Sequence, residues 1–188
     1  RIRTRASGPL IADLYVDCSG FRSLLLGKTM GTPFRPVGRE LINDRAITAR
    51  IPFVDKQAEL VTYQNATALS AGWVWQIPLW SRMGTGYVYS SGFSTPDRAE
   101  EEYRAFLGPD RIKDIEFKHV DMKAGRHEAA WVKNCVGIGI SDGFLEPLES
   151  TSISLTQGSI CDLAQGITKG ATRADRYGFN YLQAELFD

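Results

Sequence analysis

The chain has 188 residues, of which 43% are hydrophobic, and its 22 basic side chains equal its 22 acidic ones, so its formal net charge is zero. This length and composition support a packed core and exclude an intrinsically disordered chain. The balanced charge argues against a nucleic-acid or polybasic membrane surface, because such surfaces need an excess of basic residues.

Segments that would indicate a particular compartment are missing from the sequence. No window has the about 20 apolar residues of a membrane-spanning helix, and residues 1–9 lack the apolar core of a signal peptide. Cys18, Cys135 and Cys161 form no CxxC pair, so we expect small buried side chains in a cytoplasmic protein, without disulfides or zinc. The sequence does not begin with methionine and stops within a helix-like pattern, so we expect an internal piece of a larger protein.

The first part of the chain has the pattern of a strand, a glycine turn and a short helix. We predict an apolar-rich strand over 12–17, a turn over 18–20 and a helical turn over 21–26 that Gly27 ends. Residues 28–44 contain several glycines and prolines and predict a loop.

Three segments rich in β-branched and aromatic residues, 46–54, 67–78 and 86–90, predict an antiparallel meander. Residues 72–78 read Gly-Trp-Val-Trp-Gln-Ile-Pro, and the spacing of Trp73 and Trp75 directs both side chains to one face of a strand. Such an aromatic face is typical of a packed core or of a wall beside a flat, conjugated ligand.

The second half alternates predicted helices and strands. A hydroxyl cap, an early proline and acidic residues predict a helix over 94–107. Strands are expected over 114–120 and 129–133, a buried strand over 135–140, and a second helix over 149–165. His119 and His127 lie in segments without ligand spacing, so we expect both at the surface and predict no metal site.

The segment Phe144-Leu-Glu-Pro-Leu-Glu-Ser-Thr-Ser-Ile153 connects the predicted buried strand to the second helix. A helix start leaves unpaired N–H donors, so an anion or a flavin edge could bind there. Alternatively, Ser150, Thr151 and Ser152 cap the helix themselves. Glu149 has apolar neighbours in the sequence, which suits either a partly buried functional carboxylate or a solvated one at the helix start.

Three segments together, 12–27, 72–78 and 131–153, resemble the flavin-dependent halogenases, the tryptophan halogenase family, in the family's order. The resemblance implies an α/β fold with α+β character, part of an FAD-binding Rossmann-like fold of the flavoprotein monooxygenase type. Residues 1–188 would be a single fragment that joins the later part of the FAD-binding module to an antiparallel, substrate-side sheet.

The resemblance also implies a reaction. In this family reduced FAD reacts with oxygen to form a hydroperoxide, chloride or bromide converts it to hypohalous acid, and the oxidant crosses a tunnel to an electron-rich aromatic such as tryptophan or an indole. A separate flavin reductase supplies the reduced flavin. By resemblance, Trp73, Trp75 and Pro78 belong to the partition that keeps substrate away from the flavin.

Further site residues follow from the same resemblance. Thr151 and Ser152 match the positions whose backbone amides hold the halide, and Ile140 and Ile153 match positions that contact FAD. Glu149 matches the family's catalytic glutamate, which orients the halogenating agent or stabilises the cationic intermediate.

Two parts of the family pattern are missing from these 188 residues. The fingerprint GxGxxG does not occur, and neither Lys28 nor Lys56 lies in the motif of the family's catalytic lysine. We therefore expect the isolated chain neither to bind FAD tightly nor to halogenate. Asp142 occupies a position where alanine is usual in the family. The alternatives are a flavin-dependent aromatic monooxygenase and a non-catalytic structural or aromatic-binding fragment.

Overall fold

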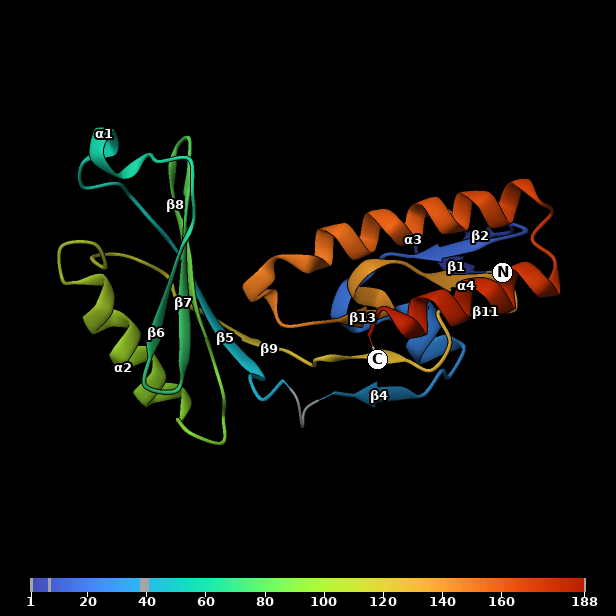
Figure 1. The fold of residues 1–188 in the computed structure, drawn as a ribbon, viewed down its shortest axis with the longest axis horizontal. Helices are drawn as coiled ribbons and strands as arrows, with labels where there is room; N and C mark the ends of the chain where they lie inside the picture. The colour runs from blue at the N-terminus through green and yellow to red at the C-terminus, as the bar shows by residue number, and fades with distance from the viewer. Residues whose placement is uncertain (1, 7, 38–40, 188) are drawn as a thin grey trace. The chain divides into compact units, whose positions relative to one another are not determined.

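The computed structural model describes residues 2–6, 8–37 and 41–187, which form two units (Figure 1). The first unit comprises Arg1–Val37 with Ala124–Asp188, and the second comprises Gly38–Lys123. Both contain helices and strands, so the structure has the mixed α/β character that the sequence predicts. Within the described residues, no helix is both long and apolar enough to cross a bilayer.

The second unit is built on an antiparallel sheet of the strand order β6-β7-β8-β5-β9. Its strands are β5 (Arg45–Ile51), β6 (Asn65–Leu69), β7 (Gly72–Leu79), β8 (Arg82–Tyr89) and β9 (Lys118–Asp121), and the short helix α1 (Lys56–Glu59) follows β5. The predicted antiparallel meander is therefore confirmed.

The single strand predicted over 67–78 is wrong, because a tight turn at Ser70 and Ala71 divides it into β6 and β7. The turn is held by groups distant in sequence. Glu102 accepts hydrogen bonds from the backbone N–H and the hydroxyl of Ser70, and Tyr87 accepts one from the Ala71 N–H. No local pattern in 67–78 contains these partners.

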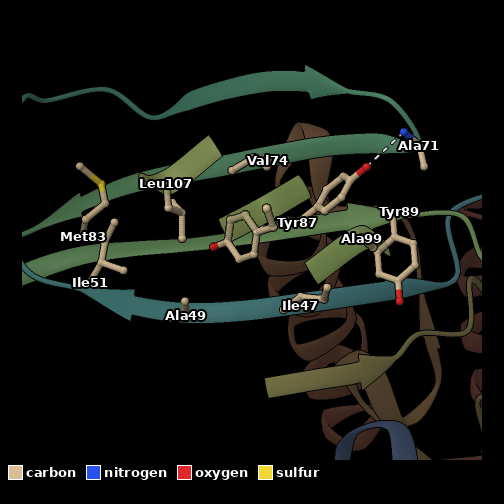
Figure 2. Packing of buried hydrophobic residues seen from close by; sticks show 11 residues of the cluster. Ile47, Ala49, Ile51, Ala71, Val74, Met83, Tyr87, Tyr89, Ala99 and Leu107 are labelled. Atoms are coloured by element: carbon tan, nitrogen blue, oxygen red, sulfur yellow. Dashed lines mark hydrogen bonds between the residues drawn. The ribbon is translucent and has the colours of Figure 1, made fainter. Parts of the chain in front are cut away.

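Helix α2 (Pro96–Leu107) covers one face of this sheet (Figure 1). It begins as predicted, since the Thr95 hydroxyl accepts from the Arg98 N–H and proline occupies the first turn. Figure 2 shows the side chains of the three central strands that meet this helix, including Val74 and Tyr87. The core between sheet and helix consists of Ile47, Ala49, Ile51, Ala71, Val74, Met83, Tyr87, Tyr89, Ala99, Tyr103 and Leu107.

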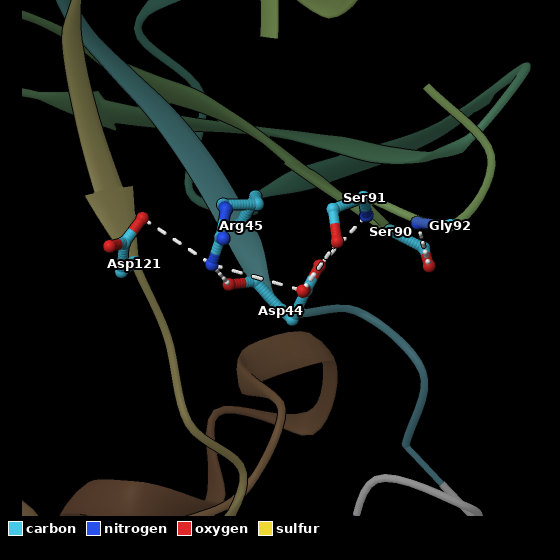
Figure 3. Close-up of polar contacts among 6 residues, drawn as sticks. All are labelled: Asp44, Arg45, Ser90, Ser91, Gly92 and Asp121. Atoms are coloured by element: carbon cyan, nitrogen blue, oxygen red, sulfur yellow. Dashed lines mark hydrogen bonds and ion pairs between the residues drawn. The ribbon is translucent and has the colours of Figure 1, made fainter. Parts of the chain in front are cut away.

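Asp44 fastens the chain before β5 to the turn after β8 (Figure 3). Its carboxylate accepts from the Ser91 N–H at 2.8 Å and from the Ser91 hydroxyl at 2.6 Å, and it lies 3.8 Å from the Arg45 guanidinium. Burial alone raises the pKa of Asp44, but these hydrogen bonds and Arg45 lower it more, so its pKa lies below the ordinary value.

Replacing Asp44 with alanine should lower the free energy of unfolding by about 1–2 kcal/mol at neutral pH, because two hydrogen bonds to a charged group are lost. A carboxyl with a depressed pKa stabilises the fold above its ordinary pKa, and this stabilisation disappears as the pH falls through the folded pKa. Urea unfolding should therefore show the deficit shrinking as the pH falls below the ordinary pKa of 3.8. The control is Asp121→Ala, which removes only an exposed partner of Arg45. Equal losses in the two variants would contradict the assignment to Ser91.

Within its described residues, the first unit contains three small sheets and two long helices. Strand β12 (Cys135–Gly137) lies between β11 (Trp131–Val132) and β3 (Tyr15–Asp17), and it is parallel to β3. Strand β10 (Gly125–His127) lies between β13 (Gly143–Phe144) and β4 (Phe34–Pro36), while β1 (Ile2–Thr4) pairs with β2 (Gly8–Leu10). Helices α3 (Thr151–Thr168) and α4 (Arg173–Glu185) run side by side (Figure 1) and pack on a core that includes Trp131, Leu163 and Phe179.

Several local predictions for this unit need correction. The expected helical turn over 21–26 is a short 3-10 turn, η1 (Gly20–Arg22), followed by a π-helix, η2 (Leu24–Thr29), which continues through Gly27. The predicted loop over 28–44 contains β4, because that segment pairs with β10. The buried strand ends at Gly137, since Gly139 has a φ of 63° and starts another 3-10 turn, η3 (Gly139–Ser141).

Two predictions about single residue types are also wrong in part. Only Cys135 is buried, whereas Cys18 and Cys161 are exposed. His119 lies at the surface, as expected, beside Glu100 at 2.7 Å. His127 is buried instead, because strand pairing encloses it and its Nδ1 lies 2.9 Å from the Thr32 carbonyl oxygen.

Candidate functional site

Two turns that follow the parallel strands β3 and β12 are hydrogen-bonded to each other. The Gly20 N–H donates to the Ser141 hydroxyl at 2.9 Å, and the Ser23 hydroxyl donates to the Ser141 carbonyl at 2.7 Å. Parallel pairing brings the carboxyl ends of the two strands to the same edge, where α/β proteins commonly bind ligands. The candidate site is therefore sought at this edge, where the turns after β3 and β12 meet.

Asp17 organises the first of these turns, and sequence reasoning did not single it out. Its buried carboxylate accepts hydrogen bonds from the backbone N–H and hydroxyl of Ser19 and from the N–H groups of Leu25 and Leu26. Burial alone raises the pKa of Asp17, but these four donors lower it more, so the pKa lies below the ordinary value. The signal in the sequence is an aspartate at the end of a strand, directly before a Cys-Ser-Gly turn.

The second turn leads through β13 and a 3-10 turn, η4 (Pro147–Glu149), to the start of α3. Ser150 occupies the cap position with a φ of 55°, and its side chain makes no capping hydrogen bond. The hydroxyl of Ser152 is buried and has no hydrogen-bond partner among the residues that the structure describes. Among the described residues, neither the Ser150 nor the Ser152 side chain caps this helix, so the predicted self-capping is wrong for these two residues. Anion binding at the helix start stays a prediction.

The other predicted residues of this segment are placed as follows. Ile140 lies in η3 and is partly exposed, and Ile153 lies in the first turn of α3 with 70% of its surface exposed. Thr151 and Ser152 are the first two residues of α3. Ile140 and Ser152 line one small cavity. The backbone of Glu149 ends η4, and its side chain lies outside the described part of the structure.

Asp142 lines the same cavity and is 95% buried, since only 5% of its surface is exposed. This burial raises the pKa of the carboxyl to about 7, although the nearby Arg126 guanidinium favours the ionised form. Asp142 directly follows η3, which packs against α3, and its carbonyl accepts a hydrogen bond from the His127 N–H of β10.

The tryptophan strand β7 lies in the second unit. Trp73 and Trp75 project to the same face, as predicted, with ring centroids 6.1 Å apart and an interplanar angle of 57°. Trp75 covers Gly86 of the neighbouring strand β8, where an added Cβ would overlap its ring. Pro78 is paired with Met83 near the end of the same hairpin.

A hollow of about 360 Å³ lies beside Trp75 on the sheet. Its lining combines Trp75 and Gly84 with the cationic residues Arg50, Arg82 and Lys118. The face of β7 that carries the two indoles therefore lies outside the core under α2. Strand β7 contributes Val74 to that core, and neither Trp73 nor Trp75 belongs to it. Among the described residues, no group of three or more His, Cys, Asp or Glu side chains could hold a metal ion.

Comparison with known proteins identifies relatives of the whole chain. A model of the tryptophan halogenase family matches residues 2–188. Tryptophan 6-halogenase SttH from Streptomyces toxytricini is 41% identical over 186 residues, which are 98% of this chain and 35% of that protein. Tryptophan 7-halogenase RebH from Lentzea aerocolonigenes is 40% identical over 166 residues, 87% of this chain and 31% of that protein.

Solved structures agree with these relatives. The crystal structure of SttH has a TM-score of 0.93 at 41% identity and covers 99% of this chain and 38% of that chain. The structure of VirX1 has a TM-score of 0.91 at 47% identity and covers 95% of this chain and 34% of that one. The chain spans about a third of the length of the curated relatives that it matches.

Proposed function

Because the chain belongs to the tryptophan halogenase family, we propose that it is part of an FADH2-dependent halogenase that chlorinates or brominates an electron-rich aromatic such as tryptophan or an indole. Family membership agrees with the predicted fold class, an α/β fold related to the FAD-binding Rossmann-like enzymes. The observation that carries the proposal is the family match over residues 2–188, at about 40% identity to tryptophan halogenases.

The start of α3 supports a halide site at Thr151 and Ser152. Its cap residue, Ser150, makes no side-chain hydrogen bond to the amides of the first turn. A helix start favours anions through these donors and through its dipole. We propose that the backbone amides of Thr151 and Ser152 hold chloride or bromide.

The residues around this helix start also suit an apolar ring system. Ile140 and Ile153 both expose aliphatic side chains, which water would otherwise cover. We propose that both contact FAD, which, when bound in its reduced form, supplies the activation of oxygen. The pyrophosphate of FAD would require a fingerprint that these 188 residues do not contain.

Trp73, Trp75 and Pro78 are proposed as a partition that keeps the aromatic substrate away from the flavin. Two rigid indoles on one strand face suit this role, because they occupy a large volume and have few rotamers. Glu149 is proposed as the carboxylate that orients the halogenating agent or stabilises positive charge on the aromatic ring. We further propose that the enzyme is cytoplasmic and that a separate flavin reductase supplies its reduced flavin.

The test is halide-dependent product formation by the full-length enzyme. Purified protein is supplied with FAD, NADH, a flavin reductase, oxygen, and tryptophan or indole, with chloride, bromide or neither. We expect mass spectrometry to show halogenated product only when halide is present. An oxygenated product that forms equally without halide would support the monooxygenase alternative, and a protein that neither binds FAD nor forms product would support the non-catalytic one.

A further inference from the structure

A small cavity lies beside the start of α3, within the first unit. Its volume is about 20 Å³, which is enough for one water molecule. It is lined by polar groups of η3, α3 and α4 and by a few apolar side chains, namely Gly139, Ile140, Asp142, Gly143, Leu145, Ser152, Leu155, Thr156, Ser159, Gln183 and Phe187.

Two oxygen atoms at this cavity are unsatisfied. Asp142 Oδ1 and Ser152 Oγ are buried and have no hydrogen-bond partner within the described ranges. Their polar neighbours are all bonded, since the Thr156 hydroxyl donates to the Ser152 carbonyl at 2.7 Å and the Ser159 hydroxyl donates to the Gln183 amide oxygen at 2.6 Å. Unpaired buried polar groups are costly and rare, so the packing of the described side chains alone does not satisfy these two oxygen atoms.

Among the described residues, the groups around Asp142 are the Arg126 cation and neutral polar side chains. On β10, the Arg126 guanidinium favours the ionised form of Asp142. The His127 N–H donates a hydrogen bond to the Asp142 carbonyl, and the His127 Nδ1 lies beside the Thr32 carbonyl oxygen. The groups from α3 and α4 are the neutral Ser152, Thr156, Ser159 and Gln183. Asp162, also on α3, lies beyond Gln183, at 3.5 Å from its amide nitrogen.

We propose that Asp142 is a positioning residue for the halide, an inference that rests on the halide site proposed above. Asp142 permits anion binding at the start of α3 while its carboxyl carries a proton, and it opposes anion binding once the carboxyl is ionised. Ser152 provides the connection, because it is the second residue of α3 and lines the cavity together with Asp142.

The direction follows from electrostatics in a buried place. A neutral carboxylic acid adds no charge near the helix start, so the amides attract the anion without opposition. An ionised carboxylate places a second negative charge next to the anion, in surroundings that screen charge far less than water does. Since burial brings the titration of Asp142 close to neutral pH, halide affinity should fall as the pH rises through this range.

The experiment measures chloride binding to the full-length, FAD-loaded enzyme by chlorine NMR line broadening at about pH 5.5 and about pH 8.5. We expect the wild-type affinity to fall about tenfold between these values. Asp142→Asn keeps the shape of the side chain without its charge, so its affinity should change less than about twofold. Asp162→Asn removes a carboxylate of α3 that does not itself line the cavity, and should behave as the wild type.

Each outcome bears on the proposal separately. A fall in affinity that persists in Asp142→Asn, or that is missing from the wild type, would overturn the role of Asp142 and leave the proposed function standing. Absence of chloride binding at both pH values would contradict the halide site and, with it, this inference. A fall that disappears in Asp162→Asn as well would assign the effect to the general charge of α3.

Discussion

Replacing Asp142 with asparagine should stabilise the protein by about 2–4 kcal/mol at about pH 8, an unusual gain for the removal of a charged group. The reason is the cost of ionising a buried carboxyl. Burial raises the pKa of Asp142 from 3.8 to about 7, so the folded chain holds a proton that the unfolded chain has released over this interval. The free energy of unfolding therefore falls as the pH rises from about 4 to about 7.

The advantage of the asparagine variant should consequently depend on pH. Near pH 4 both side chains are neutral in the folded state, so the two proteins should differ by less than about 1 kcal/mol. Urea unfolding at several pH values measures this difference, and hydrogen exchange of α3 assigns it to the first unit. Asp162→Asn is the matched control, with no expected gain. A constant difference between wild type and Asp142→Asn at every pH would contradict the buried titration.

Replacing Gly86 with alanine should destabilise the protein by about 1–3 kcal/mol and displace the Trp75 ring. A Cβ at Gly86 would overlap the Trp75 indole and lie 2.8 Å from the Ile47 carbonyl oxygen. The backbone of β5 is fixed by its pairing with β8, so the indole must move. Urea unfolding measures the loss, and near-ultraviolet circular dichroism reports the change in the Trp73–Trp75 pair.

Gly84 provides the matched control on the same strand and face. A Cβ there would lie 3.6 Å from a Leu79 methyl carbon and 3.7 Å from the Ile77 carbonyl oxygen, which are ordinary contacts. Gly84→Ala should therefore be neutral or slightly stabilising, because alanine loses less backbone freedom on folding than glycine does. If both substitutions cost the same, the loss would come from the strand itself and not from Trp75.

The features that the sequence predicted well depend on short-range relations. Thr95 and Pro96 mark the start of α2 because capping involves groups within one turn of the helix. Trp73 and Trp75 share a face because strand side chains alternate, whatever packs against them. The segments at 72–78 and 131–153 indicated the tryptophan halogenase family, and the family match over residues 2–188 confirms this prediction.

The features that it missed depend on partners far away in the chain. The turn at Ser70 is held by Glu102, and His127 is enclosed by pairing with a segment that looked like a loop. Serine is a residue type that commonly caps helices, yet Ser150 has a left-handed backbone conformation and its side chain makes no capping hydrogen bond. These outcomes could not be predicted locally, because the competing partners are brought together only by folding.

The sequence by itself indicated the family, which the match over residues 2–188 confirms, and it predicted the antiparallel meander and the start of α2. The site residues that the resemblance assigns stay a prediction. Only the tertiary structure decided that Asp142 is buried, with one oxygen that has no partner among the described residues, that Ser152 lines the same cavity, and that Trp75 lies over Gly86. The physical reason is that residue type and spacing determine periodicity and capping potential, whereas burial and charge compensation depend on which distant elements pack around a side chain.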